Sequence, residues 1–109
     1  MTRLLALAVA LALTAGCSDS TGPNATGVSV QDNSFNPSSN TVAVGQTVTW
    51  TWTGSTGHNV TWDGGSPAAS ATQSSGTYQR NFAQAGTFNY HCSIHGGAGS
   101  GMHGTVTVQ

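Results

Sequence analysis

The chain has 109 residues, enough for one domain, and a formal net charge of only −1. Charged residues make up 5% of it and form no basic patch, so a nucleic-acid partner is not expected. Apolar residues alternate with polar ones, and no helical period is apparent. This alternation predicts a folded β domain rather than a helical or disordered chain.

Residues 1–17 differ in composition from the rest of the chain. Arg3 precedes an apolar run, residues 4–13, that is too short to span a bilayer and has the length of a signal-peptide core. The run ends in Ala15-Gly16-Cys17, which resembles a bacterial lipoprotein signal. That resemblance implies cleavage before Cys17 and a lipid on its thiol, with ordinary secretion as the alternative. We therefore expect an exported protein that is lipid-anchored at the membrane through Cys17, in the periplasm or at the cell surface.

A linker and one domain are expected to follow the signal. Residues 18–27 are rich in Ser, Thr, Gly, Pro and Asn, which is typical of a flexible tether, and residues 28–109 form the domain. If Cys17 carries lipid, Cys92 is the only thiol left in the mature chain. A lone thiol in an oxidising compartment needs something to occupy it, and a metal ion would do so.

Short strands separated by turns are predicted through the first two thirds of the domain. The clearest covers residues 47–53, where Val48, Trp50 and Trp52 share one face. Arg80 shares the face of two aromatic residues in another strand, which suggests a position at a sheet edge. The predicted strands in this part are 27–30, 41–44, 47–53, 58–62 and 77–83, and the segment 32–37 is predicted as a turn.

The stretch from residue 86 to residue 108 predicts two further strands joined by a loop. Phe88, Tyr90 and Cys92 fall on one face of the first strand because side chains alternate. The loop that follows consists mostly of Gly, Ala and Ser. With these, the chain has seven or eight short strands, which favours a β-sandwich.

A soft ligand set lies on this last unit. Cys92, His95 and Met102 offer a thiolate, an imidazole and a thioether, which suit copper better than zinc, calcium or magnesium. His58 is the candidate for a second imidazole, because its parity with Val60 and Trp62 turns it toward the core, as Cys92 is turned.

The other two histidines are expected to be solvated. His91 has the opposite parity to Cys92 and should face solvent, and His103 is also expected on the surface. A structural zinc site is disfavoured because thioether is a poor zinc ligand. A Cys/His nucleophile lacks an orienting third residue and a substrate cleft, so we do not expect an enzyme.

Together the motifs of residues 28–109 resemble the cupredoxin family, and most closely its plastocyanin-like type I (blue) copper proteins. The matching motifs are Phe35-x-Pro37, Val44-Gly45-x-Thr47-Val48-x-Trp50, His58-Asn59-Val60, Gly86-x-Phe88-x-Tyr90-x-Cys92-x-x-His95 and Met102-x-Gly104-x-Val106-x-Val108. The resemblance implies an all-β, eight-stranded Greek-key sandwich with one mononuclear copper. It implies His58, Cys92 and His95 as equatorial ligands and Met102 as the axial ligand. It also implies that Asn59 ties the two ligand loops together.

One spacing departs from the family pattern. Six residues separate His95 from Met102, two more than is usual in plastocyanin. The intervening residues are small, so the loop can bulge without strain. His103 remains a competing axial ligand at this point.

The resemblance implies an extracytoplasmic electron carrier. Copper would cycle between Cu(II) and Cu(I) as a monomeric protein shuttles single electrons between redox partner proteins, with His95 as the exit near the surface. A copper-binding protein for delivery or buffering would use the same residues and is the alternative. A metal-free adhesion module is a third hypothesis.

Overall fold

A computed structural model describes residues 25–109 of the chain. The predicted signal peptide, the lipid site at Cys17 and the tether up to residue 24 lie outside the described residues. Within residues 25–109 no helix has the length and apolar character needed to cross a bilayer. Ala25 already contacts the domain, since its carbonyl accepts a hydrogen bond of 2.6 Å from Asn40 Nδ2.

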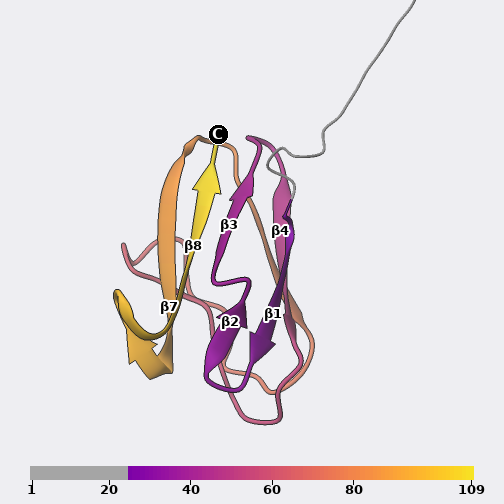
Figure 1. Ribbon diagram of the computed structural model, residues 1–109, viewed down its shortest axis with the longest axis vertical. Coiled ribbons are helices and arrows are strands. Elements are labelled where there is room, and N and C mark those ends of the chain that lie inside the picture. Colours follow the sequence, from indigo (N-terminus) through magenta and orange to yellow (C-terminus); the bar gives the residue numbers. More distant parts are fainter. Residues whose placement is uncertain (1–24) are drawn as a thin grey trace, which may run out of the picture.

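Eight strands form a sandwich of two four-stranded sheets (Figure 1). One sheet has the order β2-β1-β4-β6 and the other the order β3-β8-β7-β5. The strands are β1 (Gly27–Gln31), β2 (Ser34–Asn36), β3 (Ser39–Val42), β4 (Thr47–Trp52), β5 (Thr61–Trp62), β6 (Thr77–Asn81), β7 (Gly86–Gly97) and β8 (Ser100–Val108). The predicted all-β sandwich of seven to eight strands is confirmed.

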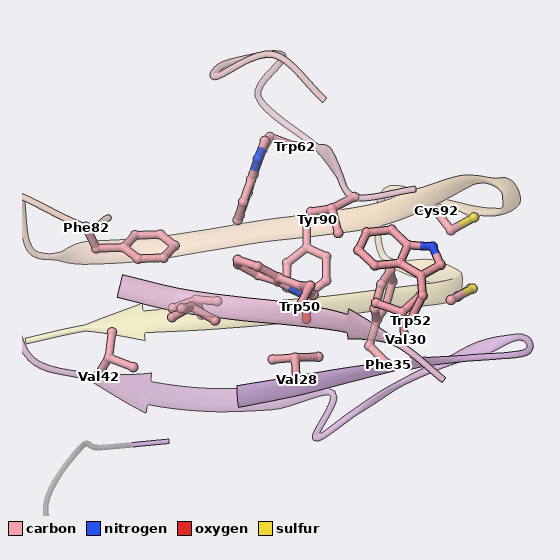
Figure 2. Packing of buried hydrophobic residues seen from close by; sticks show 14 of the residues in the cluster. Val28, Val30, Phe35, Val42, Trp50, Trp52, Trp62, Phe82, Tyr90 and Cys92 are labelled. Carbon is pink, nitrogen blue, oxygen red and sulfur yellow. The ribbon is translucent and has the colours of Figure 1, made fainter. Parts of the chain in front are cut away.

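An aromatic core fills the space between the sheets (Figure 2). Trp50 of β4 meets Trp62 and Tyr90 of the opposite sheet edge-on, with ring centroids 5.7 and 5.4 Å apart. Such pairs stabilise by roughly 0.5–1.5 kcal/mol each beyond the area they bury. All three rings are buried, so the residues that alternation assigned to the inner faces of these strands do face the core. The core therefore holds the two sheets at a fixed separation.

Two segments differ from the sequence prediction. The predicted turn at 32–37 contains the short strand β2, which pairs with β1 around Phe35. The predicted strand at 58–62 shrinks to the two residues of β5, while His58 forms an isolated bridge with Gln73. β2 pairs with β1 across the short turn at Asp32 and Asn33, whereas His58 pairs with Gln73 in a later segment, and alternation along a single strand reports neither pairing.

Arg80 lies at a sheet edge, as predicted. It belongs to β6, the last strand of its sheet, and its guanidinium covers the rings of Trp62, Phe82 and Phe88 at 4.3, 4.6 and 4.8 Å. Burial lowers the pKa of this guanidinium from its ordinary value. The side chain therefore closes one side of the aromatic core, with its guanidinium lying against the rings.

Tyr90 and Gly104 explain a close approach between β7 and β8. They are direct partners in the ladder, and a Cβ on Gly104 would lie 2.5 Å from the Tyr90 hydroxyl oxygen. Burial raises the pKa of Tyr90 to about 12, because the apolar surroundings disfavour the phenolate. The glycine two residues after Met102 is thus required by the ring that it faces.

We expect Gly104→Ala to destabilise the fold by about 1–3 kcal/mol, since the added methyl group must displace the Tyr90 ring. Gly27→Ala is the control, because a Cβ there meets nothing within 4 Å. Denaturant midpoints of the two variants test this. Equal midpoints would show that the ring moves aside without cost.

Candidate metal centre

The ligand-bearing segment is a bulged hairpin and not the open loop that the sequence predicted. β7 continues to Gly97 and pairs with β8 on both sides of an irregularity between His91 and Gly96. Cys92 and His95 lie within this register shift. The bulge breaks the alternation, which lets an inward residue and a residue three positions later share one site.

Glycines make the hairpin possible beyond the bulge. A Cβ on Gly96 would collide with the backbone nitrogen of Met102, and a Cβ on Gly101 would lie 2.7 Å from the carbonyl oxygen of His95. Gly101 also has a φ of +63°, which disfavours other residues. The two extra residues between His95 and Met102 are therefore absorbed by a tight turn, and Met102 is brought against Gly96.

Three of the predicted ligand residues converge at one end of the sandwich. His58 Nδ1 lies 4.0 Å from Cys92 Sγ and 3.0 Å from His95 Nδ1, and Cys92 Sγ lies 3.7 Å from His95 Nδ1. Within residues 25–109 this is the only group of three or more His, Cys, Asp or Glu side chains so arranged. An ion about 2.0–2.3 Å from each atom, as is usual for bonds to nitrogen and sulfur, fits inside this triangle.

The three residues differ in exposure. His58 and Cys92 are fully buried, whereas His95 is exposed. Figure 2 shows Cys92 at one end of the aromatic core. Cys92 is unpaired, in keeping with its predicted role as a lone thiol. The site therefore has a buried inner side and one imidazole that reaches the surface.

Hydrogen bonds to Gln73 and to Trp52 of β4 fix the backbone of His58. Its backbone forms two hydrogen bonds of 3.0 Å with Gln73, and its carbonyl also accepts a 3.0 Å hydrogen bond from Trp52 Nε1. On the ring, Nε2 lies 2.9 Å from Asp32 Oδ1 and 3.0 Å from the hydroxyl of Thr56. Because a carboxylate can only accept, Nε2 carries the proton and Nδ1 presents its lone pair to the other two residues.

Asp32 is a site residue that the sequence prediction missed. Its carboxylate also accepts hydrogen bonds from the backbone and hydroxyl groups of Ser55 and Thr56, which tie the β1–β2 turn to the segment before His58. The His58 contact and these bonds hold the pKa of Asp32 well below its ordinary value. Nothing in the spacing of a turn aspartate points to a histidine 26 residues away.

Asn59 joins the two ligand segments, as the family resemblance implied. Its Nδ2 donates to Ser93 Oγ at 2.9 Å and to Thr72 Oγ1 at 3.0 Å, and its Oδ1 accepts from the Ser93 backbone at 3.0 Å. Thr61 donates a further bond to Oδ1. The side chain is buried, so these bonds link the residues next to His58 and Cys92 directly.

The two candidates for an axial ligand have different surroundings. Met102 is 1% exposed and belongs to the core cluster, whereas His103 is exposed and its Nδ1 lies 2.9 Å from the Gly101 carbonyl oxygen. The expectation that His91 is merely solvated is wrong. It is half-buried, and its Nδ1 lies 2.6 Å from Asp63 Oδ1, because the turn after β5 brings that carboxylate alongside.

Comparison with known proteins agrees with this geometry. The family model of copper binding proteins, the plastocyanin/azurin family, matches residues 24–109. This chain belongs to that family. A plastocyanin from Scenedesmus fuscus is 36% identical over an alignment of 86 residues, and the match covers 69% of this chain and 86% of that protein.

Solved structures share the fold. An amicyanin variant in its oxidised form is 31% identical, with a TM-score of 0.61, over 78% of this chain and 82% of that one. A purple cupredoxin from Nitrosopumilus maritimus has a TM-score of 0.64 at 24% identity, over 77% of this chain and 99% of that one. The protein is a plastocyanin-like cupredoxin, and its cofactor is copper.

We expect Asn59→Ala to destabilise this cupredoxin by about 1–3 kcal/mol, because the Ser93 backbone N–H loses its acceptor in a part-buried setting. The shift in denaturant midpoint at constant slope measures the effect. Asn89→Ala, at an exposed asparagine of β7, is the control and should destabilise the protein less than Asn59→Ala does, because it removes only one exposed hydrogen bond, from the Thr105 hydroxyl. Similar midpoints for both variants would contradict a linking role for Asn59.

Proposed function

We propose that this chain is a blue copper electron carrier in which His58, Cys92, His95 and Met102 hold one copper ion. The observation that carries the proposal is the triangle of one sulfur and two nitrogens with sides of 3.0, 3.7 and 4.0 Å. Copper bound there supplies a one-electron Cu(II)/Cu(I) couple. The surrounding residues hold the ligand side chains in place and shield His58 and Cys92 from water, while His95 remains exposed.

The choice of Met102 as the axial ligand rests on burial. Its side chain is buried in the cluster that contains Cys92, while His103 is exposed on the opposite face of β8. A thioether beside two imidazoles and a thiolate suits copper better than zinc. Four protein ligands also leave no open position for a substrate, which favours a carrier over an enzyme.

The framework keeps the ligands in place whether or not an electron is present. Asp32 holds the far nitrogen of His58, and Asn59 binds the residue that follows Cys92. Such supports fix ring orientation and ligand basicity around a metal. A carrier benefits because little has to rearrange when the electron arrives or leaves.

His95 offers the route to a redox partner protein. It is exposed, the exposed Ile94 precedes it, and the hairpin beyond it contains only small residues. Charged side chains are scarce in the chain, so we expect docking through shape and apolar contact and not through strong electrostatic steering. The small side chains would let a partner's cofactor approach closely.

The location is also part of the proposal. The apolar run before Cys17 supports export and lipid anchoring at the membrane, with the cupredoxin domain outside the cytoplasm. A single buried thiol, as at Cys92, is protected in such an oxidising compartment when copper occupies it.

The test of the function is the absorption spectrum of the domain loaded with Cu(II). We expect an intense visible thiolate-to-copper band that Cys92→Ser abolishes, while Met102→Leu keeps most of the colour and shifts the reduction potential. A metal-free adhesion module would show no colour and retain no copper after dialysis. Colour that survives in Cys92→Ser would overturn the ligand assignment.

Asp32 should tune the copper through His58. Asp32→Asn removes the negative charge beside Nε2 of His58, and this charge makes Nδ1 a stronger ligand for copper. We therefore expect the affinity for Cu(II) to fall about 10- to 100-fold. The reduction potential should rise by roughly 59 mV for each tenfold fall in the affinity for Cu(II) relative to the affinity for Cu(I).

Competition titration and voltammetry measure these two quantities. Asp63→Asn is the matched control, because it removes the same charge from a carboxylate that contacts His91 and not His58. Equal shifts in both variants would mean that overall charge, and not the His58 contact, sets the potential.

A further inference from the structure

Two histidines that the copper centre does not use lie opposite each other on the outer face of the β7–β8 pair. His91 and His103 are direct partners in the antiparallel ladder. Their chain neighbours Cys92 and Met102 are buried, so alternation turns the two imidazoles outward. Figure 1 shows the two strands side by side along this face.

Side chains on this face reach across the two strands. The preceding outward pair in the ladder is Asn89 with Thr105, and the Thr105 hydroxyl donates to Asn89 Oδ1 at 2.7 Å. Directly opposed residues have Cβ atoms about 4.5–5.5 Å apart, a separation that two imidazoles can bridge through one ion. The two histidines therefore occupy positions from which both rings can bind the same metal.

The hydrogen bonds of the two rings set their tautomers alike. His91 Nδ1 faces Asp63 Oδ1 at 2.6 Å, and His103 Nδ1 faces the carbonyl oxygen of Gly101 at 2.9 Å. Both partners are acceptors, so each neutral ring keeps its proton on Nδ1 and leaves a lone pair on Nε2. A carboxylate or carbonyl behind the ring is the usual support of a metal-binding histidine.

We propose that His91 and His103 form a second metal site, which binds one divalent transition-metal ion such as Zn(II) or Cu(II) through two Nε2 atoms. Imidazole suits these metals, and water would complete the coordination at the exposed face. Asp63 acts as a positioning residue that orients the His91 ring. The site is separate from the proposed copper centre, because the β7 and β8 backbones lie between the outward rings and the buried Cys92 and Met102.

The experiment is a calorimetric titration of Zn(II) into the copper-loaded protein, in which the first site is already filled. We expect one additional binding event, weakened at least tenfold by His91→Gln and by His103→Gln, and weakened less by Asp63→Ala. Asn89→Ala, on the same face, should leave it unchanged. The visible thiolate-to-copper band, followed in every variant, reports whether the fold and the first site are intact.

The outcomes separate the two sites. Zn(II) binding that needs both histidines while the copper colour persists supports the second site. No additional binding event, or one that survives both histidine substitutions, overturns it and leaves the copper proposal untouched. Loss of colour in Cys92→Ser with continued dependence of Zn(II) binding on His91 and His103 would likewise show that the second site stands without the first.

Discussion

The register shift between His91 and Gly96 is the constraint on which the metal centre depends. Regular alternation would send Cys92 inward and leave His95 on the opposite face, so one strand could not supply both ligands. The shift brings His95 Nδ1 to 3.7 Å from Cys92 Sγ. The glycine pair Gly96–Gly101 then restores the ladder, because only residues without a Cβ permit that backbone contact. The bulge is therefore a structural requirement of the site and not a defect in the strand.

The sequence was sufficient wherever one residue's environment follows from its neighbours on the same strand. Alternation placed Cys92 with Tyr90 in the core and turned His58 inward, and both are fully buried. It failed where pairing between segments decides the structure. The strand β2 forms because it pairs with β1 across the short turn at Asp32 and Asn33, and Asp32 joins the site because this turn folds over the segment before His58. Neither contact can be seen in the alternation of residues along one strand.

Charge is used sparingly and always with a partner in the part of the chain that the structure describes. Among Asp, Glu, Lys and Arg, residues 25–109 contain only Asp32, Asp63 and Arg80. Asp32 binds one imidazole, Asp63 binds another, and Arg80 lies over aromatic rings at the edge of the core. Few charges are thus left to attract a partner at long range. Near the metal centre the surface presents the His95 imidazole, the exposed Ile94 and small residues.

His58 and Cys92 are held in place by the rest of the protein, and this bears on the choice between carrying electrons and delivering copper. A delivery protein has to release its ion, which is easier when ligands can swing away. Here His58 is held by Asp32 and by its backbone bridge, and Cys92 lies in β7 directly after residues that pair with both β5 and β8. Only His95 lies on the surface. Two fixed inner ligands favour retention of copper through repeated oxidation and reduction. The protein, and not the ion, sets the ligand arrangement around both Cu(II) and Cu(I).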